Sequence, residues 1–125
     1  MAVSLANCSN IESSGMEVTS EEFSELVENI KNSDIYENPK NWEERWLMPS
    51  SDEMIKFLRK TTNTFLDDIE KIHNSDLSKE EKGKQIQDLV DALPWFDLDT
   101  EEREFLADTI APAIEAAGFD PWSIL

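Results

Sequence analysis

Residues 50–74 read SSDEMIKFLRKTTNTFLDDIEKIHN, and this stretch decides the fold. Ser50 and Glu53 have the spacing of a capping box, in which a hydroxyl and a carboxylate satisfy free amide groups at a helix start. The positions that follow keep a helical period, so one stripe of the helix can face a core. That stripe consists of Met54, Ile55, Leu58, Thr61, Phe65, Leu66, Ile69 and Ile72. The pattern predicts a helix over 51–74, about 36 Å long at 1.5 Å per residue.

Four more helices are predicted around this one. Their start signals are the capping-box pairs Thr19/Glu22 and Ser78/Glu81, the N-cap Asn38 before Pro39, and the N-cap Asp99 or Thr100. The predicted spans are 20–32, 39–47, 79–93 and 100–117. No segment shows the β-branched alternation, bounded by turns, that is typical of a strand. The sequence therefore predicts an all-α fold, a single-domain bundle of about five helices.

Local signals predict how two of these helices present their residues. Trp42 and Trp46 are four residues apart, so we expect them on one face of the helix over 39–47. Gly118 follows the last periodic residue of the final helix. We expect it to adopt a left-handed conformation, with Phe119 touching Ile114 across the helix end.

Composition bounds the class of protein. The chain has 125 residues, of which 39% are hydrophobic, enough for one domain with a core. It carries 28 acidic and 11 basic residues, a formal net charge of −17, so a phosphate backbone would repel it. Its one cysteine, Cys8, excludes an internal disulfide and a cysteine-based zinc site. No apolar run approaches the roughly 20 residues of a membrane-spanning helix.

The chain divides into two parts at residue 17. Residues 1–16 are small and polar, so we expect a flexible leader followed by a single helical domain over 17–125. The apolar tail, residues 120–125, should dock on that domain. The segment Leu5–Cys8 is similar to a lipoprotein cleavage site, but the residues before it supply no basic or hydrophobic signal region. We expect a cytoplasmic protein, with a remnant of an exported lipoprotein around Cys8 as the alternative.

Motifs for metal binding or catalysis are weak. Glu70-x-x-His73 has the spacing found in helical di-metal proteins, but it needs a second histidine that the chain lacks. We expect His73 near a helix C-terminus, where the dipole favours a protonated imidazole. Asp97-x-Asp99-x-Glu101 resembles half of a calcium loop, but Glu102 stands where that loop needs glycine. Three glycines are too few for a phosphate-binding loop, and Cys8 has no basic neighbour that could activate its thiol. We therefore expect no metal, no cofactor and no catalysis.

Acidic residues are concentrated in two segments. Residues 17–37 hold seven acids and only Lys31, and residues 97–125 hold eight and only Arg103. Helical spacing places many of these acids opposite the apolar stripes. The two acidic faces comprise Glu21, Glu25 and Glu28 on the first helix and Glu101, Glu104, Asp108 and Glu115 on the last. Because no base on either face compensates the repulsion, the pattern favours a basic partner.

Two aromatic residues complete the predicted binding surface. Pro94-Trp95-Phe96 occupies a turn between helices, so Trp95 and Phe96 are the aromatic candidates best placed for contact.

In size, helical pattern and charge, with acidic runs over Thr19–Glu28 and Asp97–Asp108, residues 17–125 resemble the small acidic immunity proteins of bacterial toxin–immunity systems. The resemblance implies a non-catalytic protein that binds and neutralises a basic toxin domain, such as a nuclease. Two alternatives stay open. One is a nucleic-acid mimic that inhibits a DNA- or RNA-binding protein. The other is a bacterial helical domain without a toxin partner.

Overall fold

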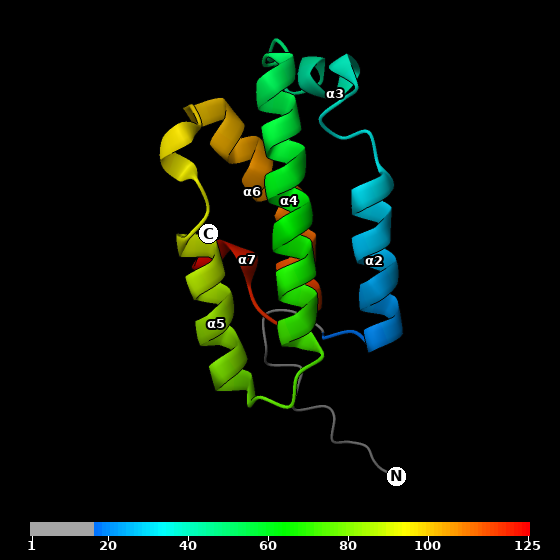
Figure 1. Cartoon of the computed structure of the whole chain (residues 1–125), viewed down its shortest axis with the longest axis vertical. Helices are drawn as coiled ribbons and strands as arrows, with labels where there is room; N and C mark the ends of the chain where they lie inside the picture. The colour runs from blue at the N-terminus through cyan, green and yellow to red at the C-terminus, as the bar shows by residue number, and fades with distance from the viewer. Residues whose placement is uncertain (1–16) are drawn as a thin grey trace.

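The computed structural model describes residues 17–125, and these residues form helices and no strand. The helices, labelled as in Figure 1, are α2 (Ser20–Asn32), α3 (Pro39–Glu43), α4 (Asp52–His73), α5 (Lys79–Asp91), α6 (Thr100–Ala116) and α7 (Pro121–Ile124), with a 3₁₀ turn η1 (Trp95–Asp97) before α6. The predicted all-α bundle is confirmed. Four of the five predicted helices keep their bounds to within two residues, and α3 is the exception. The predictions about the leader and Cys8 lie outside the described residues.

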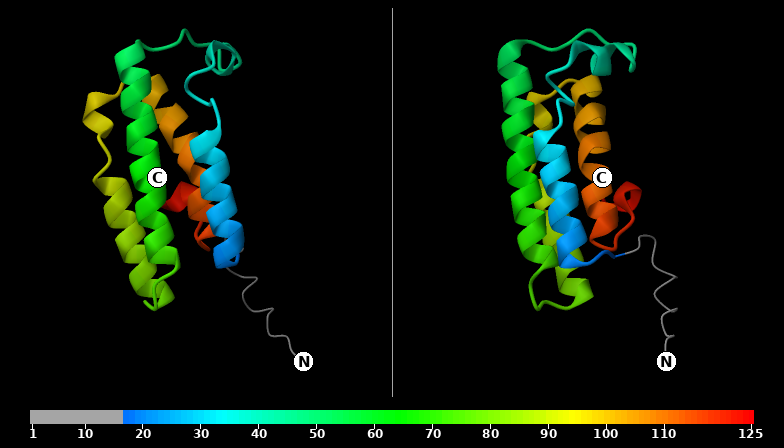
Figure 2. Two further views of the ribbon diagram at one scale, coloured as in Figure 1. Left: turned by 45° about the vertical axis from the view of Figure 1, so that its right-hand side comes forward. Right: turned by 90° about the vertical axis from the view of Figure 1, so that its right-hand side faces the viewer.

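Three long helices enclose the core. Helices α2, α4 and α6 pack against one another, and α5 packs against α4 from the other side. Helices α2 and α5 run opposite in direction to α4 and α6 (Figures 1 and 2). The fully buried apolar side chains include Phe23 and Val27 of α2, Leu58, Leu66 and Ile69 of α4, Ile86 of α5, and Leu106, Ile110 and Ile114 of α6. Most of the apolar stripe over 54–72 is therefore the face that α4 turns to its three neighbours.

Side-chain caps begin the long helices. Thr19 and Glu22 exchange hydrogen bonds at the start of α2, as predicted, and the bonds from Thr19 lower the pKa of the Glu22 carboxyl. Asp99 and Glu102 form the same reciprocal pair at the start of α6. Ser78 is the N-cap of α5 and its hydroxyl accepts from the Glu81 N–H, but the predicted capping box is incomplete, because the structure shows no bond from the Ser78 N–H to the Glu81 carboxylate. The starts of these three helices were thus predictable from local sequence.

The predicted capping box at the start of α4 is wrong. Ser51, and not Ser50, is the N-cap, and its hydroxyl accepts a hydrogen bond from the Met54 N–H. Ser50 instead donates its hydroxyl hydrogen to the Glu102 carboxylate of α6. The Ser50/Glu53 spacing fits a capping box, but the tertiary partner takes the hydroxyl. This bond ties the start of α4 to the start of α6.

Helix α3 is shorter than predicted because the chain turns out of the helix before residue 47. The helix ends at Glu43, and Trp46 has a left-handed backbone with φ 62°. Trp42 is buried, and its indole N–H donates to the Tyr36 carbonyl with Nε1 and O 2.9 Å apart. Trp46 is almost fully exposed. The two tryptophans therefore do not share a face, contrary to the prediction from their spacing.

Helix α6 ends in a Schellman motif. Gly118 has φ +100°, as predicted, and its N–H donates to the Glu115 carbonyl. The Phe119 N–H donates to the Ile114 carbonyl, which brings these two residues into contact. The Phe119 ring lies against Gly83 of α5, where an added Cβ would come within 2.9 Å of a ring carbon. Glycine weakens a helix interior by about 1 kcal/mol relative to alanine, and this close approach explains why it stands here.

The C-terminal tail docks on the body, as predicted. Helix α7 packs against α6, Pro121 is buried, and Ile124 and Leu125 pack against the core. The Gln87 side chain of α5 donates to the Ile124 carbonyl at 3.1 Å (Nε2 to O). Trp122 differs from the rest of the tail, since it is 63% exposed. The tail thus joins α5 to α6.

Arg59 joins α4 to the end of α2 and to the segment that follows. Its guanidinium donates to the carbonyls of Ile30 at 3.1 Å and Ser33 at 2.7 Å. It also donates two hydrogen bonds to the Glu37 carboxylate, each with N and O 2.9 Å apart. These bonds lower the pKa of the Glu37 carboxyl and raise the pKa of the Arg59 guanidinium. The guanidinium lies over the Tyr36 ring, 5.5 Å from its centroid.

Replacing Gly118 with alanine should lower the free energy of unfolding by about 1 kcal/mol, because a residue with a Cβ is strained at this positive φ. Urea denaturation would measure the difference. Gly118→Asn is the matched control, since asparagine tolerates the left-handed conformation better than alanine. A larger loss in Gly118→Asn would show that crowding by Lys79 and Glu17, and not the backbone, limits this position.

Arg59→Lys should lower the free energy of unfolding by about 2 kcal/mol, because an ammonium cannot hold a carboxylate with two parallel bonds and also reach the carbonyls of α2. Denaturation at pH 7 would measure this loss, with the exposed change Lys60→Gln as the control.

The same pair predicts a pH dependence. Since the folded pKa of Glu37 is lowered, its stabilisation is present above the unfolded pKa and is lost as the pH falls through the folded value. The stability gap between the wild type and Arg59→Lys should therefore narrow in acid. A constant gap from pH 7 toward pH 2 would contradict the assignment of this stability to the Arg59–Glu37 pair.

Candidate functional site

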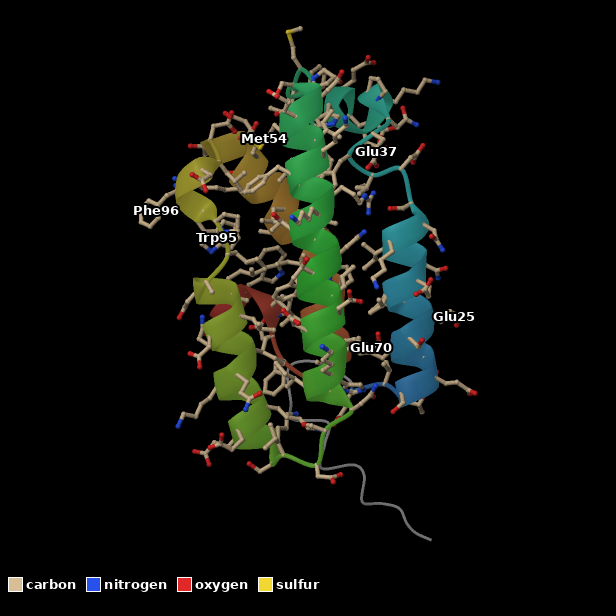
Figure 3. The ribbon with its side chains drawn as sticks, in the orientation of Figure 1. Glu25, Glu37, Met54, Glu70, Trp95 and Phe96 are labelled. Carbon is tan, nitrogen blue, oxygen red and sulfur yellow. The ribbon has the colours of Figure 1, made fainter. Side chains whose placement is uncertain are left out.

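The first predicted acidic face lies on the outside of α2. Glu21, Glu25 and Glu28 are all exposed, and Glu25 lies on the side of α2 away from α4 (Figure 3). Lys31 is the only base of this helix, and it pairs with Asp67 of α4. The hydrogen bond to Asp67 is the main cause of a raised pKa for the Lys31 ammonium, with a smaller coulombic effect from Glu28. The base is therefore held against α4 while the three carboxylates face outward.

The second predicted acidic face lies along α6. Its four residues, Glu101, Glu104, Asp108 and Glu115, are all exposed. Arg103 is the only base of this helix, and its Nε donates to the carbonyls of Trp95 at 2.8 Å and Leu98 at 3.1 Å. The base of α6 is thus turned to η1, just as the base of α2 is turned to α4.

Asp108 forms an ion pair, so the prediction that no base compensates the negative charge of the α6 face is wrong for this residue. Nη1 of Arg45 lies 2.8 Å from Oδ2 of Asp108. Arg45 belongs to the segment after α3, so the pair joins parts of the chain that are distant in sequence. Its guanidinium also lies 4.6 Å from the centroid of the Phe105 ring, a cation–π contact. The other three carboxylates of the α6 face form no ion pair within residues 17–125.

A groove lies between α2 and α6. It has a volume of about 310 Å³, and its lining is mainly apolar. The lining comprises Asn29, Ile30, Ser33 and Ile35 from α2 and the segment after it, Phe105, Asp108, Thr109 and Pro112 from α6, and Arg45. Glu25 lies one helical turn before Asn29, and Glu104 lies one turn before Asp108. Asp108 is thus the acidic residue in the groove lining, and Glu25 and Glu104 each lie one turn from a lining residue.

The two predicted aromatic contacts differ in exposure. Trp95 is half-buried, packs against the core and donates its indole N–H to the Val90 carbonyl at 2.8 Å (Nε1 to O). Phe96 is 98% exposed. In Figure 3, Phe96 and Glu25 lie on opposite sides of the molecule. Trp95 is thus a packing residue, and the structure does not bring Phe96 to the acidic face of α2.

Two exposed apolar residues were missed by the sequence pattern. Trp46 is 94% exposed and Met48 is 86% exposed, both in the segment between α3 and α4. Helical spacing predicted Trp46 on the same face as the buried Trp42. Glycine or asparagine usually marks a left-handed position at a helix end, and neither stands here. The sequence therefore carries no signal for this surface.

His73 and Asp99, which the sequence suggested as possible metal ligands, serve in packing and in helix capping. His73 ends α4, one turn after Glu70, and it is buried. Its Nε2 lies 3.0 Å from the Val18 carbonyl oxygen, and its ring stacks on Phe23 with centroids 4.5 Å apart. Asp99 caps α6. Among the residues that the structure describes, no group of three or more His, Cys, Asp or Glu side chains is placed to hold a metal ion.

No protein-family model, curated protein sequence or solved structure matches this chain. In the described part of the chain, no helix combines the length and apolar character needed to cross a membrane. Its function is therefore inferred from the chemistry of its own surface.

The double variant Glu104→Lys with Glu115→Lys should keep the free energy of unfolding or raise it by about 0.3 kcal/mol, because Glu115 lies at the negative end of the α6 dipole. Asp108→Lys should lower it by about 1 kcal/mol, since it sets a like charge against Arg45. Urea denaturation at low salt would compare the variants. If Asp108→Lys is as stable as the double variant, the Arg45 pair contributes nothing.

Proposed function

We propose that this chain is a non-catalytic binding protein that neutralises a basic partner, acting as an immunity protein in a bacterial cytoplasm against a cognate toxin such as a nuclease. The observation that carries the proposal is the apolar groove between α2 and α6, two helices whose predicted acidic residues are all exposed and of which Asp108 lines the groove. The net charge of −17 supports a partner of the opposite sign.

Charge and apolar surface would act at different stages of binding. Unpaired carboxylates attract a basic surface over the Debye length, about 8 Å at physiological salt, and so speed its approach. The groove offers apolar surface that leaves water on contact and slows dissociation. Association should therefore slow as salt rises, while dissociation changes little.

The groove also favours this proposal over nucleic-acid mimicry. A mimic presents rows of negative charge in place of phosphates. Here the groove between α2 and α6 is mainly apolar, and Asp108 in its lining is paired with Arg45. A toxin domain that combines basic and apolar residues matches this surface better than a protein that binds phosphates alone. Mimicry of a nucleic acid is therefore the alternative that the experiment below distinguishes from immunity.

The experiment that tests immunity is co-production of this chain with the products of its neighbouring reading frames. One of these products should be toxic, carry a basic C-terminal domain and lose its toxicity when this chain is present. Harmless neighbours, or a toxic one that this chain does not neutralise, would contradict the proposal. Tight binding of the purified chain to a housekeeping DNA-binding protein would favour mimicry.

Glu104→Lys with Glu115→Lys should slow association with the toxin domain about tenfold at low salt, because it reverses charge beside the groove. Stopped-flow kinetics would measure the rates. The matched control is Asp76→Lys with Asp88→Lys, which changes the net charge equally at exposed positions in and before α5. An equal loss in the control would mean that the α6 face is only solvated surface.

A further inference from the structure

Trp46 and Met48 form an apolar knob between α3 and α4. Both side chains are almost fully exposed, whereas Trp42 before them is buried and Leu47 between them packs against the core. The knob is therefore held by a packed residue before it and another within it. A tryptophan that leaves water on binding contributes a large apolar area, and tryptophan is enriched among the residues that dominate interfaces.

The backbone holds Trp46 outward in a strained conformation. After α3, the Trp46 N–H donates to the Glu43 carbonyl and the Leu47 N–H donates to the Trp42 carbonyl, each at 2.9 Å from N to O. These are the two hydrogen bonds of a Schellman motif, and Trp46 takes its left-handed position with φ 62°. Glycine is usual at that position, and a bulky residue there is strained.

The end of α6 shows the same motif without this strain. There, Gly118 takes the left-handed position, and the N–H groups of Gly118 and Phe119 make the equivalent bonds. The chain thus ends two helices with the same hydrogen bonds, once with glycine and once with tryptophan. Because the Trp46 side chain is exposed, packing within residues 17–125 does not offset its strain.

Acidic residues flank the knob. The exposed carboxylates on either side of it in sequence are Glu43, Glu44, Asp52 and Glu53, none of which forms an ion pair within the described residues. Arg45 is held by Asp108, and the next bases in sequence, Lys40 and Lys56, stand beyond these carboxylates. A second copy of this chain would bring like charges together, so a basic protein is the complementary occupant.

We infer that the knob is the apolar anchor of the partner interface and enters an apolar pocket with a basic rim on that protein. The inference rests on the proposed function for the sign of the partner. Arg45 lines the groove and directly precedes Trp46, so the knob follows a groove residue in sequence. Trp46 takes the anchoring role that sequence had suggested for Trp95, whose indole is bonded within the fold.

The strain is tested without a partner. Trp46→Gly should raise the melting temperature by about 4 °C, because glycine fits the left-handed position and no packing is lost. Phe96→Gly is the matched control, an exposed aromatic residue without a positive φ, and it should lower the melting temperature slightly. If Trp46→Gly does not raise the melting temperature, the inference is overturned.

The anchor is tested by cross-linking at position 46. A variant with p-benzoylphenylalanine in place of Trp46, produced in cells that naturally make this chain, should capture a basic protein on irradiation. The control variant with p-benzoylphenylalanine in place of Phe96 should not capture that protein. The captured protein is then identified by mass spectrometry, purified and titrated against the variants. Trp46→Gly should weaken its Kd about 30-fold or more, the effect of a hot-spot residue, and Phe96→Gly less than about threefold.

The outcomes separate the anchor from the proposed function. No cross-link at position 46, an acidic captured protein, or a Kd unchanged by Trp46→Gly would overturn the anchor. If Trp46→Gly weakens binding but Glu104→Lys with Glu115→Lys leaves association unchanged, the anchor stands and the electrostatic proposal fails. If only the charge reversal matters, the proposed function stands without this anchor.

Discussion

The chain leaves α2 at Ser33, and the guanidinium of Arg59 reaches from α4 to the carbonyls of Ile30 and of this C-cap residue. The same group holds the Glu37 carboxylate with two parallel bonds. One side chain thereby joins the end of α2, the segment after it and the middle of α4. Because this segment leads from α2 to α3, its path decides where α3 can pack.

Tyr36 extends this constraint to the rest of the molecule. Its ring lies under Arg59, and its hydroxyl shares a 2.8 Å hydrogen bond with Thr62 of α4. Burial raises the pKa of that hydroxyl, so it stays protonated. The Tyr36 carbonyl accepts the Trp42 indole N–H, and both aromatic rings pack on Phe105 of α6. Phe105 also lines the groove between α2 and α6, so this aromatic cluster forms part of the groove wall.

Features set by neighbouring residues could be predicted from the sequence, and features set by distant ones could not. The helical period of residues 50–74 and the cap at Thr19 depend on spacing alone, and both predictions are confirmed. Ser50 was misplaced because a carboxylate of another helix binds its hydroxyl. The acidic faces of the candidate site followed from spacing. The Arg45–Asp108 pair and the exposed Trp46 did not, because packing and a single left-handed residue place them.

The conformation of Trp46 also bears on how this chain can change over generations. Tryptophan has one codon, TGG, and a change of its first base to G encodes glycine. Since glycine suits a left-handed residue, this mutation is both accessible and favourable for folding. Mutation and selection for stability alone would remove the tryptophan quickly. On the proposal that Trp46 anchors a partner, related chains whose lineages have lost that partner should carry glycine at this position, and those that keep it should keep the aromatic ring.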